Sequence, residues 1–388
     1  MSRKMKKLLP IFLIVWVDLL GFSIILPLLP YYAKSLQLSD FLVGLLVASY
    51  SICQFIAGPI LGEMSDRFGR RPLLLYSQLG SFTGFLLLGT ALFLPHSIVW
   101  LFISRIIDGF SGGNVTVTQA YISDVLEPEE WTKGYALIGV AFGLGFLFGP
   151  ALGGFLSVYG YQWPAYAAAL CSLISITGTF FLLKEPKRRL SPDRKGGLFV
   201  YLRVIEYFKI SSLRNLLAIF LFFVLPFNLY TSMFALYALK QLSFTARDTG
   251  YFLAVVGLFG IIWQGGAVSP IVKRLGETKA LMIGLLANMI GLLSIVFVDV
   301  WWKLIIVAVF FSFGTGMTRP SLTSLITQAA PEDRRGGVLG VTSSIESFSR
   351  IAAPLMGGWV IGSLHPNWLG LAGGGLTLIA LILTFLGR

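Results

Sequence analysis

The most informative side chains are charged ones that stand inside long apolar segments. Asp18 lies in the apolar run 8–33, and Arg105 and Asp108 lie three residues apart in the run 98–124. A charged side chain at the centre of a bilayer costs about 2.5–3.5 kcal/mol on insertion scales, so it usually faces a polar interior and has a function. A carboxyl group that gains and loses a proton could couple proton movement to movement of a solute. The alternative is an aspartate locked by hydrogen bonds between packed helices.

A second set of charges occurs late in the chain. Glu346 and Arg350 are four residues apart, which places them on one face of a helix, and Arg319 precedes a proline. The six intramembrane charges sum to zero, which suits a zwitterionic or amphiphilic organic molecule better than a simple ion. Neutral polar residues could add contacts and aromatic residues could form walls, although packing also explains them. These are Asn114, Asn228, Gln264 and Asn288, with Tyr230, Phe234, Tyr237 and Trp263.

The composition indicates a membrane protein. Of 388 residues, 56% are hydrophobic and 12% are charged, against about 25% charged in ordinary soluble domains. Each bilayer crossing needs about 20 apolar residues and must satisfy its own backbone hydrogen bonds, so the crossings are expected to be helices. The sequence predicts an all-α polytopic protein with twelve of them, at about 8–33, 40–62, 72–94, 98–124, 134–158, 162–183, 213–239, 248–272, 279–297, 302–328, 337–362 and 367–387.

The distribution of basic residues predicts the topology. If the N-terminus is cytoplasmic, 23 of the 30 Lys and Arg fall on the cytoplasmic side, four on the other side and three within helices. Because cytoplasmic loops carry the excess of Lys and Arg, both termini are expected to be cytoplasmic in a multi-pass protein of the cell membrane. The four residues on the opposite side are Lys34, Lys240, Arg247 and Lys303.

Motifs of several other protein classes are absent from the sequence. It has no H-E-x-x-H motif, no phosphate-binding loop of Walker type, and no cysteine set with metal-ligand spacing, since Cys53 and Cys171 both lie in apolar runs. We therefore expect no enzyme activity, no ATP-driven pump, no cofactor and no metal. The net charge of +12 is expected to come from loops that orient the helices in a lipid bilayer, not from nucleic-acid binding.

The chain is expected to divide into two related halves. A basic connection at 184–212 separates an N-terminal six-helix bundle, 1–183, from a C-terminal six-helix bundle, 213–388. The string Gly149-Pro150-Ala151-Leu152-Gly153-Gly154 recurs as Ala353-Pro354-Leu355-Met356-Gly357-Gly358, and Asp66-Arg67-Phe68-Gly69 recurs in weakened form as Lys273-Arg274-Leu275-Gly276. Duplicated six-helix halves are typical of transporters that move two bundles about a central site.

A dense group of charges connects the second and third apolar segments. The pattern G-x-x-x-D-R-x-G-R-R at 62–71 resembles the loop motif of the major facilitator superfamily of secondary transporters. That resemblance implies a gate in which Asp66 lies against the start of the segment 337–362, near Gly336, and Arg70 bridges to Asp124. Anchoring of the loop to lipid phosphates is the simpler alternative. The residues of this gating motif are Gly62, Asp66, Arg67, Gly69, Arg70, Arg71 and Asp124.

Two further strings resemble motifs of proton-coupled members of this superfamily. Arg105 and Gly109 match the R-x-x-x-G pattern of the fourth helix. The string G-x-x-x-G-P-x-x-G-G at 145–154 is similar to the motif of the drug:proton antiporters, although Ala136 stands where the longer form expects glycine. Small residues four apart permit close helix approach, and an internal proline bends a helix. The antiporter-type residues are Gly145, Gly149, Pro150, Gly153 and Gly154.

The resemblance implies a fold of twelve helices in two pseudo-symmetric bundles and a monomeric secondary transporter that is similar to the tetracycline and multidrug efflux group. We expect it to export a hydrophobic or zwitterionic compound in exchange for protons by alternating access, with Asp18 as the proton or cation site. The alternatives are a carrier of organic anions, sugars or lipids by uniport or symport, and a membrane protein that does not transport. The sequence does not name the substrate.

Overall fold

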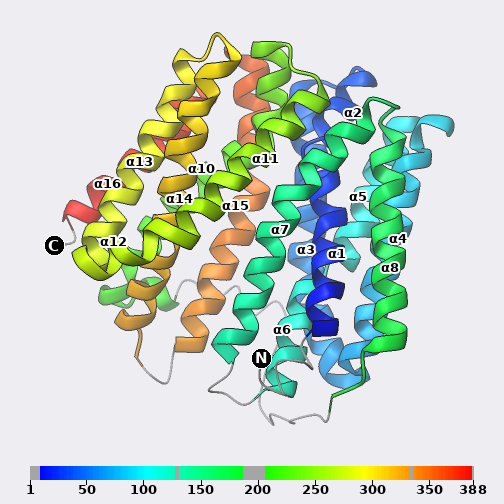
Figure 1. The fold of residues 1–388 in the computed structure, drawn as a ribbon, viewed down its shortest axis with the longest axis horizontal. Coiled ribbons are helices and arrows are strands. Elements are labelled where there is room, and N and C mark those ends of the chain that lie inside the picture. Colours follow the sequence, from blue (N-terminus) through cyan, green and yellow to red (C-terminus); the bar gives the residue numbers. More distant parts are fainter. Residues whose placement is uncertain (1–8, 127–130, 187–205, 332–334, 387–388) are drawn as a thin grey trace. The chain divides into compact units, whose positions relative to one another are not determined.

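The computed structural model describes residues 9–126, 131–186, 206–331 and 335–386, and long helices dominate them (Figure 1). Their apolar side chains favour burial or lipid, and a helix satisfies every backbone group within its own segment. The α-helices are α1 (Leu9–Ile25), α2 (Leu29–Ser35), α3 (Asp40–Phe68), α4 (Arg70–Thr90), α5 (Ser97–Ser111), α6 (Asn114–Val125), α7 (Trp131–Ser157), α8 (Gln162–Leu182), α10 (Ser211–Leu242), α11 (Ala246–Ile262), α12 (Val268–Leu275), α13 (Glu277–Ser294), α14 (Leu304–Ala329), α15 (Arg335–Ser363) and α16 (Trp368–Leu386).

Within the described ranges, ten helical stretches are long and apolar enough to cross a membrane. The other two crossings predicted from the sequence correspond to α5 followed by α6, and to α15. The first of these is interrupted at Gly112 and Gly113, and the second carries Glu346 and Arg350. Of these two crossings, the first is therefore a broken helix, and the second is less hydrophobic because it contains charged residues.

The chain divides into two compact units. Unit 1 comprises Met1–Leu36, Ser49–Phe199 and Ala246–Ala254, and unit 2 comprises Gln37–Ala48, Val200–Thr245 and Val255–Arg388. The core of unit 1 is formed mainly by apolar residues of α1, α3, α4, α6 and α7. The core of unit 2 is formed mainly by residues of α10, α13, α14, α15 and α16. The two predicted bundles stay a prediction, and residues 187–205 of the predicted connection lie outside the described residues.

The sequence repeat appears as a repeated helix contact. In unit 1, a Cβ at Gly250 of α11 would overlap the Pro150 carbonyl and lie 2.9 Å from the Gly154 Cα in α7. In unit 2, a Cβ at Gly44 of α3 would overlap the Pro354 carbonyl of α15. Helices in lipid associate mainly through such close packing of small residues, because lipid tails are as apolar as leucine. Each unit therefore uses glycine to bring one helix against a proline-containing partner.

The two related loops also share a backbone conformation. Gly69 has φ of 109° and Gly276 has φ of 79°. They directly precede α4 and α13. Both angles lie in the region that L-residues rarely adopt, so a side chain would strain either turn. The weak repeat at 66–69 and 273–276 thus preserves the glycine that each turn needs.

We predict that Gly250→Ala destabilises the protein, because the added methyl group has no room between α11 and α7. Overpacking of this kind typically costs about 1–3 kcal/mol. The measurement is the melting temperature of the purified protein in detergent. Gly260→Ala is the matched control, because it lies in the same helix and its Cβ would meet nothing within 4 Å. Equal melting temperatures for the two variants would contradict the prediction.

Candidate functional site

Asp18 of α1 is hydrogen bonded to Asn114 of α6. The Asn114 Nδ2 donates to Asp18 Oδ2 at 2.6 Å, and both side chains are half-buried. In the part of the chain that the structure describes, no ion pair involves Asp18. The Asn114 Oδ1 is buried without a partner there. The carboxylate is therefore held by a neutral amide, and its charge can still be neutralised by a proton or a cationic group.

A break between α5 and α6 positions Asn114. The Gln54 side chain of α3 donates to the Gly112 carbonyl at 2.8 Å, and a Cβ at Gly113 would lie 2.7 Å from Leu61. This break is stabilised by a polar partner from a neighbouring helix, as interrupted helices in membranes require. Sequence reasoning missed Gln54, although a glutamine within the apolar run 40–62 was a possible signal.

The glycines of the 145–154 motif bring α7 close to the helix that carries Asp18. A Cβ at Gly145 would lie 3.3 Å from the Leu19 backbone, and one at Gly153 would lie 2.6 Å from the Ile24 carbonyl. A Cβ at Gly149 would overlap the Ser23 side chain. Ser23 in turn donates its hydroxyl to the Gly145 carbonyl at 2.7 Å. The motif thus fixes α1, and with it the position of Asp18.

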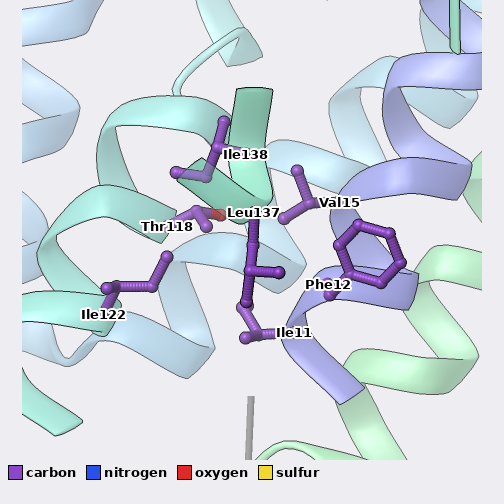
Figure 2. A pocket seen from close by; sticks show the side chains of 7 residues that line it. All are labelled: Ile11, Phe12, Val15, Thr118, Ile122, Leu137 and Ile138. Atoms are coloured by element: carbon purple, nitrogen blue, oxygen red, sulfur yellow. The ribbon is translucent and has the colours of Figure 1, made fainter. Parts of the chain in front are cut away.

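Figure 2 shows a small cavity lined by Val15 and Thr118, among others. These two residues are three and four positions from Asp18 and Asn114, about one helical turn along α1 and α6. The cavity volume is about 10 Å³, which is room for about one water molecule. Thr118 is its one polar lining residue, and the hydroxyl of this residue has no partner among the described atoms. The cavity is too small for an organic compound. Its lining residues are Ile11, Phe12, Val15, Thr118, Ile122, Leu137 and Ile138.

Arg105 and Asp108 form a pair inside the interface between α4 and α5. The Arg105 Nη1 lies 3.1 Å from the Asp108 Oδ2, and the side chains are 3% and 2% exposed. The guanidinium also lies 5.5 Å from the Phe85 ring centroid. Because both charges are enclosed by protein, the geometry favours the packing alternative over a direct contact with solute. Their expected role in modulating Asp18 stays a prediction.

Arg319, Glu346 and Arg350 form an ion triad in unit 2. Arg319 Nη2 lies 2.5 Å from Glu346 Oε2, and Arg350 Nη2 lies 3.0 Å from Glu346 Oε1. The arginine side chains are 46% and 41% exposed, whereas the glutamate is 19% exposed. The triad has a net charge of +1. In contrast to the Arg105–Asp108 pair, the arginines of the triad are not enclosed by protein.

Most of the other predicted contact residues are buried among neighbouring helices. Tyr230 and Tyr237 are 1% and 0% exposed, and Tyr237 donates to the Ile295 carbonyl at 3.2 Å. Asn228 donates within its own helix, to the Val224 carbonyl. Of the predicted polar residues, Gln264 is exposed on the π-helical segment Trp263–Ala267 that continues α11. Buried residues at the remaining positions are Phe234, 0% exposed, and Asn288, 0% exposed.

The charged loop at 62–71 is organised around Arg70. Its Nη1 lies 2.6 Å from Asp66 Oδ1, and its Nε donates to Asp124 Oδ2 at 2.8 Å. The Arg70 Nη1 also donates to the Ser65 hydroxyl. The expected contact between Arg70 and Asp124 is therefore present. The expected contact of Asp66 near Gly336 would join the two units, and it stays a prediction.

Glu185 was not recognised from the sequence, yet it caps α4. Its two carboxylate oxygens accept from the Arg70 and Arg71 backbone N–H groups at 2.8 and 2.9 Å. The first N–H groups of a helix have no partner within the helix and favour an anion, so this contact fixes the start of α4. Glu185 lies in a predominantly basic connection. Its negative charge among basic residues was the one sequence feature that could have identified it.

The apolar helices define a polytopic membrane protein. A sequence profile described as Major Facilitator Superfamily matches residues 11–354 and again 265–388. The class E tetracycline resistance protein of Escherichia coli is 30% identical over 95% of this chain and 92% of its own length. Multidrug resistance protein 2 of Bacillus subtilis is 26% identical over 96% of this chain and 93% of its own length.

The similarity extends to solved structures. The nucleoside transporter NupG superposes with a TM-score of 0.81 at 12% sequence identity, covering 98% of this chain and 99% of that chain. The chain belongs to the Major Facilitator Superfamily, whose members are membrane transporters and not enzymes. The predicted family and fold are confirmed.

We predict that the Arg70–Asp124 pair contributes measurably to stability. The two side chains are 11% and 9% exposed, and breaking one side of a buried pair costs about 3–5 kcal/mol. Arg70→Gln and Asp124→Asn should each lower the melting temperature, and the double variant should lose less than the sum. The matched control is the exposed pair Arg67–Glu63, 70% and 42% exposed, which should contribute about 0–1 kcal/mol. Equal coupling free energies in the double-mutant cycles of the two pairs would contradict the prediction.

Proposed function

We propose that this protein is a proton-coupled antiporter that exports a hydrophobic or zwitterionic organic compound by alternating access. Asp18 is the site where a proton and a cationic substrate group alternate. The observation that carries this proposal is the bond of the Asp18 carboxylate to the neutral Asn114 amide at 2.6 Å. In this proposal the protein acts as a monomer in the cell membrane, with both termini in the cytoplasm, and the proton gradient drives it without a cofactor.

The relatives support export of organic compounds. Their names are those of tetracycline and multidrug resistance proteins, and this chain matches them over nearly its whole length. The glycine motif at 145–154 supports the antiporter assignment, because it packs α7 directly against the helix of Asp18. A protonated Asp18 keeps an amide partner without a net charge, and an ionised Asp18 attracts a cation. Exchange of the two at one carboxylate is antiport.

Uniport or symport of an organic anion is the second candidate. The exposed arginines of the ion triad, Arg319 and Arg350, favour it, since they offer positive charge within membrane-spanning helices. The two candidates differ in one respect that can be measured. Antiport requires proton release when substrate binds, whereas anion uniport does not.

We predict that Asp18→Asn abolishes proton coupling. In proteoliposomes with an imposed pH gradient, accumulation of the fluorescent cation ethidium should fall at least tenfold, because an amide does not titrate at neutral pH. Ethidium-induced proton release from the purified protein should disappear as well. The control is Asp299→Asn, which removes an acid whose side chain is 68% exposed and should leave both signals unchanged. Undiminished coupling in Asp18→Asn would overturn the proposal.

We predict that Asp66→Asn slows transport without weakening substrate binding. Asp66 holds Arg70 at 2.6 Å, and the gate proposed here depends on the arrangement of this loop. The initial rate of ethidium transport should fall several-fold, while the Kd for ethidium in detergent should stay within twofold. Glu63→Gln, in the same loop but on the exposed pair with Arg67, is the control. Weaker binding with a normal transport rate would show that Asp66 is not part of a gate.

A further inference from the structure

The two arginines of the ion triad in unit 2 have N–H donors that do not bond Glu346. Arg319 and Arg350 each use Nη2 for one oxygen of Glu346. A guanidinium carries five N–H donors and accepts none. Since the two side chains are 46% and 41% exposed, their remaining donors can reach solvent or a ligand. Glu346 accepts one hydrogen bond at each carboxylate oxygen, so these two bonds leave most N–H groups of the two guanidiniums without a partner from it.

The depth of the triad shows what kind of surroundings it needs. At about 1.5 Å per residue, Arg319 lies about 22 Å from the start of α14, and Glu346 lies about 16 Å from the start of α15. Both positions fall in the middle part of helices that are 26 and 29 residues long. An exposed charge at that depth is not stable against lipid, so the exposed face must border an aqueous path. A path with exposed guanidinium groups is where a solute would pass.

An aromatic surface adjoins the positive charge. The Arg319 Cζ lies 6.0 Å from the Phe227 ring centroid. Phe227 stacks on Phe311 with ring centroids 5.8 Å apart and planes at 4°. Phe311 is 2% exposed, so the apolar surface beside the charge is the exposed part of the half-buried Phe227. A ligand with an anionic group and a ring system would meet the guanidinium and this part of Phe227.

We propose that Arg319 and Arg350 form a subsite for the carboxylate, or a similar anionic group, of an aromatic organic substrate. The inference rests on the proposed function and adds the substrate class, a compound that carries an anionic group beside its ring system. Glu346 is a positioning residue, which holds the two guanidinium groups together and reduces their charge to +1. The anionic group binds the free N–H donors and does not displace the glutamate.

A merely structural ion pair would have a different geometry. The Arg105–Asp108 pair shows it, with both side chains 3% exposed or less and with equal numbers of cations and anions. The triad has an excess cation, and both of its arginines are exposed. The excess charge is unexplained by packing, and an anionic ligand would neutralise it.

The test uses norfloxacin and norfloxacin methyl ester with the full-length protein. The two probes share one fluorescent ring system and one amine, and only norfloxacin carries a carboxylate. Wild-type protein should bind norfloxacin more tightly than the ester. We expect Arg350→Gln to raise the Kd for norfloxacin at least tenfold and to leave that for the ester within twofold, because only norfloxacin loses a charge-assisted hydrogen bond in the variant. Arg350→Lys should restore part of the affinity.

Two controls separate this inference from the proposed function. Lys303→Gln removes an external cation that pairs with Asp299, and it should change neither Kd. If the wild-type protein shows no proton-coupled ethidium transport but binds norfloxacin in an Arg350-dependent way, the antiporter proposal is wrong and the subsite proposal stands. Equal Kd values of the wild type for the two probes, or an unchanged norfloxacin Kd in Arg350→Gln, would overturn the subsite even if ethidium export is proton-coupled.

Discussion

The cost of placing charge in a lipid bilayer governs the arrangement of this protein. The six charges that the sequence predicts within the membrane each have a polar partner, and the kind of partner differs from one cluster to the next. Asp18 has a neutral amide, Arg105 and Asp108 have each other, and Glu346 has two guanidinium groups. The arginines of the third cluster are exposed at the protein surface, whereas protein encloses the second cluster. The degree of exposure therefore separates charges that join helices from charges that can meet a solute.

Helix packing in lipid has no hydrophobic driving force comparable to that in water, so these clusters depend on close backbone contact. The glycines at 145–153 bring α7 against α1 and fix the helix of Asp18. Close glycine packing also occurs between α15 and α3 in unit 2, where a Cβ at Gly358 would lie 2.7 Å from the Asp40 carbonyl and 3.2 Å from the Gly44 Cα. Conservation of the small residues across the internal repeat thus has a mechanical reason, since a methyl group at these positions would separate the helices.

The sequence predicted the helices and the family well, because apolar length and loop motifs are local properties. It did not predict the break at Gly112 and Gly113 or the π-helical segment after α11, since both depend on what a neighbouring helix supplies. The Arg70–Asp124 contact was predicted and is present, whereas the partners of Asp18 and Glu185 were not predicted. Asn114 bonds a residue 96 positions away, and Glu185 caps a helix that starts 115 positions earlier. Spacing on one helix reveals neighbours four residues apart and says nothing of contacts at this range.

Asp18 and Glu346 cannot perform the same task, and charge balance indicates which of these two acids can exchange a proton. Protonation of Asp18 converts a carboxylate–amide pair into a neutral pair that can remain in an apolar environment. Protonation of Glu346 would instead leave Arg319 and Arg350 together with a charge of +2 and no anion between them. In a medium of low dielectric constant that repulsion is much larger than in water. We therefore assign proton exchange to Asp18 in the proposed mechanism, and to Glu346 the role of holding two cations at a distance that lets an anionic group join them.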